Sequence, residues 1–333
     1  MENTEKSKYE RFKGNNPNSL NSFVNRDTFA IMEAIYGQRY LDYKNKWKDS
    51  YQNIKYPLHV DVDLQDACNM SCNICHQNYR KRTHNIIDFK LIEKVLTDGR
   101  KKGLCAINFG AAGEPLLHKE ILLKGISLAS KLDIMDIFTH TNGLLLDQAF
   151  TEKLLDSGLK HLCVSIDAFT KETYEKTRRS KNFDIVVGNL IKLVELRNQK
   201  GLSTPTVRVS FCVTPLNHAE KDDFVDFWKN KTDIIETQVY NHVDDNIKIS
   251  GPFKQKSIDC KIPFKRVMVW PNGDVSLCCR YRSEDVCLGN INNKETNLSD
   301  LWQSEKMGKI QKSFNGYGVV PKTCQTCMES NYN

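Results

Sequence analysis

The hydrophobic and polar positions of the chain predict alternating strands and helices over its central part. Short apolar runs alternate there with segments whose apolar residues recur at helical spacing. The predicted strands cover residues 58–64, 106–110, 134–139, 162–166, 207–213 and 234–240. The predicted helices between them cover residues 88–102, 119–131, 147–157, 184–199 and 219–229. This order predicts an α/β fold with a parallel sheet, which we interpret as an open, partial (β/α)6 TIM-like barrel.

The N-terminal segment has a different composition from the central part. Residues 1–26 are rich in Asn, Ser, Lys and Glu and show no periodicity, which predicts disorder. Apolar residues then recur at helical spacing over 28–48, after Asp27 as a candidate N-cap. We therefore expect residues 1–55 to form a polar extension with one helix, and residues 56–250 to form the core domain.

The C-terminal segment interrupts the alternation of strands and helices and is rich in cysteine. Residues 267–277 are typical of a β-hairpin that turns at Asn272-Gly273. A small, loop-rich unit of this kind needs an additional constraint such as a metal. We expect residues 251–333 to form a small Cys-rich domain that is stabilised by metal.

Composition places limits on the environment of the protein. No run of about 18 or more apolar residues is present, so no membrane span is expected. The polar N-terminus lacks the apolar region of a secretory signal, and we expect a cytoplasmic protein. The net charge of +7 comes from Lys and Arg residues spread along the chain, so no nucleic-acid partner is expected. In a reducing compartment, clustered cysteines among the twelve favour metal binding.

Three cysteines follow the first predicted strand in a C-x3-C-x2-C pattern, namely Cys68, Cys72 and Cys75. Three thiolates can hold three irons of a [4Fe-4S] cluster and leave the fourth iron open for chemistry. A structural zinc site needs four protein ligands, and no fourth ligand closes this loop. The loop lies where a parallel sheet places its active site, at the carboxyl end of a strand. A disulfide framework is the alternative interpretation.

This cysteine loop resembles that of the radical S-adenosylmethionine (SAM) enzymes. Gly113, Glu114 and Pro115, after the second strand, are similar to the family's GGEP segment, with Ala112 in place of the first glycine. The resemblance implies that this segment binds the amino group of the methionine moiety of SAM.

Motifs after the following strands extend the resemblance. Asn142, in a Thr-Asn-Gly triplet, is similar to the family's element near the ribose of SAM. Ser165 and Asp167 are similar to the family's SxD segment. Arg178 occupies the position of a family arginine that often contacts the carboxylate of SAM. The resemblance covers residues 56–333.

The C-terminal cysteines carry a second resemblance, to the SPASM or twitch domains that bind auxiliary iron–sulfur clusters. It implies one auxiliary [4Fe-4S] cluster held by Cys260, Cys278, Cys324 and Cys327. Cys279 is the alternative to Cys278 as a ligand. A structural zinc site on four cysteines is the alternative to the cluster.

The family chemistry implied here is reductive cleavage of SAM to a 5′-deoxyadenosyl radical that abstracts hydrogen from a substrate. We expect a small polar substrate, such as a sugar, aminosugar or cyclitol, and oxidation or epimerisation as the outcome. A reducing partner such as flavodoxin or ferredoxin is implied. Modification of a peptide or protein is the second interpretation. A non-catalytic, zinc-stabilised binding protein is a remote third.

Strand parity suggests which side chains face the barrel interior. Cys212 has the parity of two polar neighbours, which makes it either a core residue or a catalytic hydrogen-atom donor. The polar candidates for gripping the substrate are Asp61, Asp63, Asn108, Arg208, Ser210 and Gln238.

Overall fold

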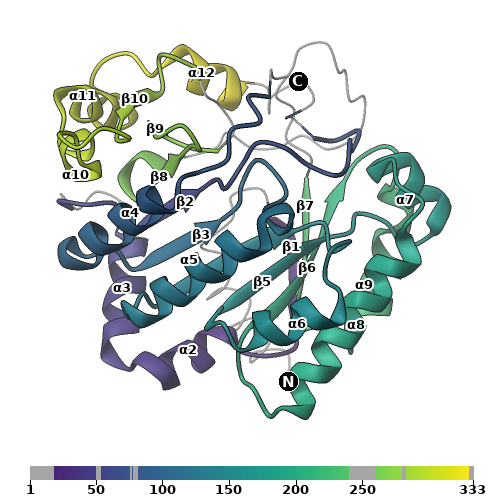
Figure 1. The fold of residues 1–333 in the computed structure, drawn as a ribbon. Helices are drawn as coiled ribbons and strands as arrows, with labels where there is room; N and C mark the ends of the chain where they lie inside the picture. Colours follow the sequence, from purple (N-terminus) through teal and green to yellow (C-terminus); the bar gives the residue numbers. More distant parts are fainter. Residues whose placement is uncertain are drawn as a thin grey trace.

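One continuous sheet forms the centre of the molecule (Figure 1). The computed structural model describes residues 19–49, 54–75, 77, 82–239, 260–279 and 283–329. Within these residues the sheet has ten strands in the order β1-β7-β6-β5-β4-β3-β2-β8-β9-β10. Its parallel centre consists of β2 (His59–Val62), β3 (Ala106–Phe109), β4 (Asp136–Thr141), β5 (His161–Ser165), β6 (Thr206–Val213) and β7 (Ile234–Val239). The prediction of a parallel sheet with TIM-like architecture is confirmed, and a further parallel strand from the C-terminal segment joins the six predicted ones beside β2.

Helices cover the outer face of the parallel strands (Figure 1). They are α4 (Phe89–Lys102), α5 (Lys119–Lys131), α6 (Gln148–Leu155), α8 (Phe183–Gln199) and α9 (Lys221–Trp228). Val60, Ile107, Val164 and Val209, on alternate strand positions, are fully buried. The period-two alternation in the sequence therefore separates an apolar outer face from a polar inner face, which lines the barrel lumen.

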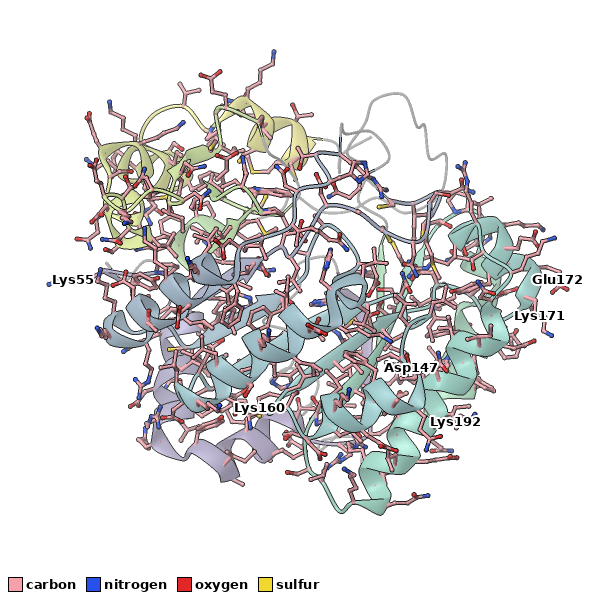
Figure 2. The ribbon with its side chains drawn as sticks, in the orientation of Figure 1. Lys55, Asp147, Lys160, Lys171, Glu172 and Lys192 are labelled. Carbon is pink, nitrogen blue, oxygen red and sulfur yellow. The ribbon has the colours of Figure 1, made fainter. Side chains whose placement is uncertain are left out.

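A helix that the sequence pattern did not predict, α7 (Lys171–Arg178), lies between β5 and α8. Thr170 caps it by accepting a hydrogen bond from the backbone N–H of Thr173. Its outer side carries Lys171 and Glu172, which lie at the periphery of the molecule (Figure 2). Its inner side buries Tyr174 and Arg178 against the cysteine loop and the end of β5.

The prediction that residues 1–26 are disordered is wrong for residues 19–24, while residues 1–18 lie outside the described part of the chain. Ser19–Val24 forms β1, which pairs antiparallel with β7. The edge of β7 offers unpaired backbone groups, and a polar segment can satisfy them without an apolar pattern of its own. The strand was missed because its stability comes from this edge.

The single predicted helix over 28–48 is two helices, α2 (Thr28–Tyr36) and α3 (Gln38–Lys48). Gly37 separates them with φ of +58°, a backbone conformation that interrupts an α-helix. Tyr40 and Tyr43 of α3 are buried beneath the amino ends of the strands. Lys44 reaches the fully buried Asp136 at 2.7 Å. The helix pair thus closes the amino end of the barrel.

The C-terminal segment continues the sheet. β8 (Arg266–Val269) runs parallel to β2, and β9 (Asp274–Ser276) and β10 (Cys287–Asn290) extend the edge antiparallel. The predicted hairpin turns at Asn272-Gly273, where Gly273 has φ of +86°. The helices α10 (Leu298–Trp302), α11 (Glu305–Phe314) and α12 (Lys322–Glu329) complete this segment. Short 3-10 helices are η2 (Pro115–His118), η3 (His218–Glu220) and η4 (Ile262–Phe264). The division into domains at residue 250 stays a prediction.

Candidate active site

The three-cysteine loop leaves β2 at the carboxyl rim of the barrel. Cys72 is buried and Cys68 and Cys75 are half-buried, and none of them forms a disulfide. Each of these thiols lies close enough to another one for their charges to interact. Burial raises the pKa of Cys68 to about 11 and also raises that of Cys75. A bound iron cluster would supply the positive charge that three closely spaced thiolates need, so these residues fit a [4Fe-4S] cluster.

The Gly113-Glu114-Pro115 segment packs directly beneath the cysteine loop. A Cβ atom on Gly113 would lie 2.1 Å from the carbonyl oxygen of Gln65 and 2.5 Å from that of Ala67. Glycine is therefore required at 113, whereas the neighbouring position accommodates the side chain of Ala112. Pro115 then begins η2 with its fixed φ.

Glu114 is a buried anchor between β3 and β4. Its carboxylate accepts hydrogen bonds from Thr141 Oγ1 at 2.7 Å, from the Asn142 backbone N–H at 2.8 Å and from the Leu116 N–H at 3.0 Å. Burial raises its pKa, and these donors oppose the rise. The carboxylate ties the segment after β3 to the Thr-Asn-Gly triplet after β4. Two motifs far apart in the sequence therefore share one hydrogen-bond network.

Asn142 links this network to the cysteine loop. Its Nδ2 donates to Asn69 Oδ1 at 2.7 Å and lies 3.9 Å from Cys68 Sγ. The structure thus brings Asn142, Glu114 and Cys68 together, which are residues from three of the predicted motifs.

The Ser165-x-Asp167 segment stands at the end of β5. Asp167 has φ of +58° and accepts a hydrogen bond from the backbone N–H of Cys212 at 2.6 Å. Ser165 Oγ accepts from Ser210 Oγ at 3.2 Å. Arg178 lies 2.6 Å from the carboxylate of Asp167 and donates to Cys72 Sγ at 3.5 Å. The segment therefore connects the cysteine loop to the lumen side of β6.

Polar side chains form a continuous hydrogen-bonded array across the lumen, which we call the lumen belt. Its members come from different strands and are Asp61, Asn108, His140, Arg208, Glu236 and Arg266. Asn108 Nδ2 donates to Asp61 Oδ1 at 2.8 Å, and His140 Nδ1 lies 3.0 Å from Asn108 Oδ1. Arg208 Nη2 lies 3.0 Å from His140 Nε2, and Arg208 Nη1 lies 2.8 Å from Glu236 Oε2. Arg266 pairs with Asp61 through two nitrogens.

The belt carries balanced charge. Asn108 uses its amide N–H on Asp61, so its oxygen accepts from His140 Nδ1, and His140 Nε2 accepts from Arg208. Burial, followed by the charge of Arg208, lowers the pKa of His140 to about 3, so the imidazole stays neutral. Each arginine of the belt has its own carboxylate.

Strand parity correctly identified Asp61, Asn108 and Arg208 as lumen residues, whereas His140, Glu236 and Arg266 were not among the predicted residues. Glu236 lies within the predicted strand 234–240 and was available from its parity, whereas His140 lies one residue beyond the predicted strand 134–139 and within β4. Arg266 was not available from parity, because it lies in the segment assigned to a separate domain.

Asp63 lies above the belt at the end of β2 and is a buried acid. Its Oδ1 accepts from the backbone N–H groups of Ala112 and Gly113, each at 3.3 Å. Its Oδ2 has no hydrogen-bond partner among the described residues. Burial raises the pKa of Asp63 to about 7.

This pKa makes stability dependent on pH. The folded state binds the Asp63 proton more tightly than the unfolded state, so the stabilisation is complete below about pH 4 and is lost as the pH rises through about 7. We expect Asp63→Asn, a neutral isostere, to raise the melting temperature relative to wild type more at pH 8 than at pH 5.5. The ionised carboxylate costs up to about 4 kcal/mol. Thermal unfolding of the anaerobic holoprotein measures this, with the exposed Asp223→Asn as control. An equal difference at both pH values would contradict the assignment.

The four predicted C-terminal cysteines lie in one group. Cys324 lies close enough to Cys278, Cys260 and Cys327 for their charges to interact, and burial is the main cause that raises the pKa of Cys324. Cys324 and Cys327 are one turn apart on α12. All four fit the ligand set of one further cluster. Cys278 and Cys279 both lie close enough to Arg266 for their charges to interact with it. Of these two, Cys278 also interacts with Cys324.

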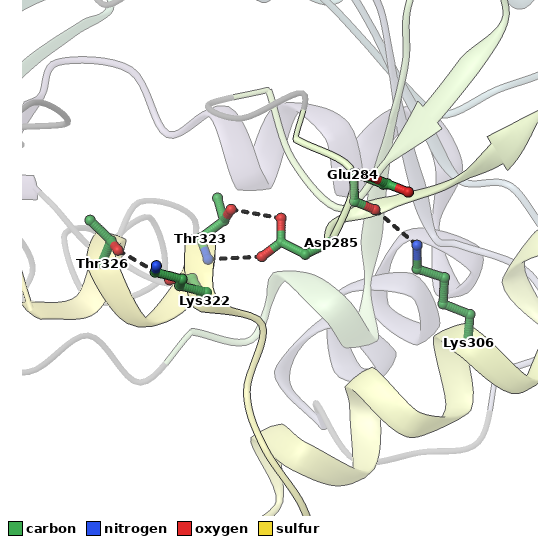
Figure 3. Close-up of a pocket in the computed structure, with 6 residues that line it drawn as sticks. All are labelled: Glu284, Asp285, Lys306, Lys322, Thr323 and Thr326. Atoms are coloured by element: carbon green, nitrogen blue, oxygen red, sulfur yellow. Dashed lines mark hydrogen bonds between the residues drawn. The ribbon is translucent and has the colours of Figure 1, made fainter.

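A surface pocket between α11, α12 and residues 284–285 shows how α12 is held (Figure 3). Asp285 accepts hydrogen bonds from the Thr323 backbone N–H at 2.9 Å and from Thr323 Oγ1 at 2.7 Å. These bonds fix the first turn of α12 immediately before Cys324. Lys306 donates to the carbonyl of Glu284 on the other side of the pocket. The hydrogen bonds of the pocket lining therefore hold the helix that carries Cys324 and Cys327.

A curled parallel sheet whose carboxyl rim carries a three-thiol loop defines an iron–sulfur enzyme of the TIM-like class. Sequence profiles agree with this class. Residues 62–227 match the Radical SAM superfamily, and residues 260–328 match the SPASM iron–sulfur cluster-binding domain. The chain belongs to the radical SAM superfamily and carries a SPASM domain. Its cofactors are SAM and [4Fe-4S] clusters.

Curated relatives include GTP 3′,8-cyclases. That of Alkaliphilus metalliredigens is 28% identical over 186 residues, which cover 54% of this chain and 53% of that protein. That of Clostridium botulinum is 30% identical over 175 residues, covering 51% and 52%. The chain thus spans about half the length of the curated relatives it matches.

Solved structures share the fold. Streptococcus suis SuiB bound to precursor peptide SuiA has a TM-score of 0.63 at 18% identity, covering 88% of this chain and 74% of that chain. Native anSMEcpe with bound AdoMet has a TM-score of 0.61 at 16% identity, covering 83% and 88%. None of the helices in the described part of the chain combines the length and apolarity needed to cross a membrane.

Proposed function

We propose that this radical SAM enzyme acts on a small polar substrate, a sugar, aminosugar or cyclitol, which binds on the lumen belt. The observation that carries the proposal is the belt itself, which lies in the lumen below the carboxyl rim that bears the cysteine loop. The proposed cluster ligands are Cys68, Cys72 and Cys75, with Cys260, Cys278, Cys324 and Cys327 for the auxiliary cluster. The proposed SAM-binding residues are Gly113, Glu114, Pro115, Asn142, Ser165, Asp167 and Arg178.

The exposure of the belt side chains supports a hydroxylated substrate. Arg208 and Arg266 keep 22% and 26% of their side-chain surface exposed, whereas Asp61 and Glu236 are almost fully buried. Arg208 uses one N–H on each of Cys163, His140 and Glu236, and a guanidinium has five. Donors therefore remain available to the lumen. Their charges are already neutralised, which suits hydroxyl oxygens better than a highly charged polyphosphate.

When bound, SAM and the reduced cluster supply a 5′-deoxyadenosyl radical that takes a hydrogen atom from substrate carbon. The belt holds the substrate and fixes which carbon faces the rim. The apolar outer face and the helix pair α2–α3 exclude water from the other directions.

Activity assays of the reconstituted enzyme with SAM and dithionite test the substrate class. We expect aminosugars or cyclitols to stimulate 5′-deoxyadenosine formation above the substrate-free rate, with deuterium transfer from labelled substrate. A flavodoxin or ferredoxin is the proposed physiological reductant. Stimulation by GTP or by a peptide, with none by the polyols, would overturn the proposal in favour of a cyclase or a peptide-modifying enzyme.

Substitution of Arg208 probes the belt. Arg208→Lys keeps the charge but loses the forked donors, so we expect kcat/KM for the polyol to fall about 10- to 100-fold. SAM cleavage without substrate should stay within twofold of wild type. Lys192→Gln, on the exposed outer side of α8 (Figure 2), is the control and should change neither rate. Equal losses in both activities would place Arg208 in a structural role.

Cys212 distinguishes the two outcomes of the reaction. It lies on the lumen side of β6, and its backbone is held by Asp167. Epimerisation needs a hydrogen-atom donor on the second face of the substrate radical, whereas oxidation needs an electron acceptor such as the auxiliary cluster. If Cys212 is the donor, Cys212→Ala abolishes epimer formation while 5′-deoxyadenosine still forms. Unchanged turnover would remove Cys212 from the catalytic residues and leave oxidation.

A further inference from the structure

The guanidinium of Arg178 has a partner on each of its three nitrogens. Nε donates to the backbone carbonyl of Ile166 at 3.3 Å, and Nη1 donates to Cys72 Sγ at 3.5 Å. Nη2 lies 2.6 Å from Asp167 Oδ2. These contacts hold the guanidinium between the cysteine loop and the end of β5.

The residues that Arg178 contacts on the cysteine loop and after β5 are buried and held by further hydrogen bonds. Arg178, Asp167 and Cys72 are each less than a tenth exposed. The carbonyl of Asp167 accepts from Asn217 Nδ2 at 2.9 Å, and its carboxylate accepts from the Cys212 backbone. On the other side, the Asn73 backbone N–H donates to the carbonyl of Thr177 at 2.9 Å, so α7 and the cysteine loop are joined beside Cys72.

We propose that Arg178 is a positioning residue that sets the reduction potential of the cluster bound at Cys68, Cys72 and Cys75, with Asp167 as its counter-charge. The proposal rests on the assignment of Cys72 as a cluster ligand, and it is independent of the substrate. It adds to the SAM-binding role proposed above for Arg178, because it concerns the potential of the cluster and not the carboxylate of SAM.

The direction of each effect follows from charge. Reduction adds an electron to the cluster, and an N–H···S hydrogen bond from a cation stabilises the added negative charge. Arg178 therefore raises the potential. Asp167 offsets part of that cationic field, so it lowers the potential. Neutralising the two residues separately should shift the potential in opposite directions.

Potentiometric measurement by EPR on the anaerobically reconstituted full chain, without SAM, tests the proposal. The relevant cluster is recognised afterwards because its signal changes when SAM is added. We expect Arg178→Gln to lower its potential, Arg178→Lys to give a smaller shift, and Asp167→Asn to raise it. Arg179→Gln, which removes an exposed neighbouring charge, is the matched control and should leave the potential unchanged.

Iron content and SAM affinity complete the test. If Arg178→Gln loads less iron, the opposite shifts of Arg178→Lys and Asp167→Asn still decide the question. Unchanged potentials in all three variants, together with weakened SAM binding in the Arg178 variants, would overturn the proposal and assign Arg178 to the carboxylate of SAM. Because no substrate is added, this result is separate from the test of the proposed substrate class.

Discussion

Replacing Cys68, Cys72 and Cys75 together by alanine is expected to lower the bound iron from about eight atoms per chain to about four. The remaining iron would belong to the cluster at the C-terminal cysteines, and SAM cleavage would be lost completely. Iron and sulfide analysis with the absorbance spectrum, after anaerobic reconstitution, measures this. The physical reason is that cluster assembly at this loop needs its three thiolate ligands.

Cys105→Ala is the matched control, since Cys105 lies by α3 at the other end of the barrel and is not a proposed ligand. It should retain the full iron content. About four irons in wild type and none in the triple variant would remove the auxiliary cluster and, with it, the proposed electron acceptor for oxidation. Zinc in place of iron would favour the non-catalytic interpretation.

The second large effect is expected at Gly113. The new Cβ of Gly113→Ala would meet two backbone carbonyl oxygens, those of Gln65 and Ala67, which cannot rotate away as a side chain would. Either the segment before Cys68 or the Glu114 segment must move, at a cost of about 1–3 kcal/mol or more. We expect a lower melting temperature and loss of SAM binding, measured by thermal unfolding and by equilibrium binding to the holoprotein.

Gly188→Ala separates this effect from glycine substitution in general. Gly188 lies within α8, and a Cβ there meets no atom within 4 Å. Alanine stabilises a helix interior by about 0.5–1 kcal/mol relative to glycine, so this control should keep or raise the melting temperature. A Gly113→Ala protein that binds SAM as tightly as wild type would show that the segment is not part of the SAM site.

The parallel strands were predictable because burial on the outer face imposes apolar residues at every second position. The same alternation placed Asp61 and Asn108 on the inner face, and the structure joins them at 2.8 Å. The order of the motifs along the chain was equally informative, since successive strands deliver their carboxyl ends to one rim. Glu114 and Asn142 meet there for this reason.

Other features depend on contacts that no local pattern records. β1 is polar and exists because the edge of β7 pairs with it. α7 is short and its sequence is mostly polar, so it carries little apolar periodicity, and its buried residues face the cysteine loop. Arg266 reaches Asp61 because β8 joins the sheet beside β2, a pairing between segments far apart in the sequence. Such long-range pairings fix side chains that complete the belt.

The closed amino end of the barrel has a kinetic consequence. Phe138 is stacked between His59 and His161, with ring centroids 5.8 Å and 4.4 Å away, and Lys44 pairs with Asp136 beside them. These buried groups lie at the amino end of the strands, so we expect a substrate on the belt to enter from the carboxyl rim, where the proposed SAM site also lies. A substrate on the belt would therefore enter first and SAM would follow it. Product release would wait for the departure of methionine and 5′-deoxyadenosine, so the proposed sites predict an ordered reaction.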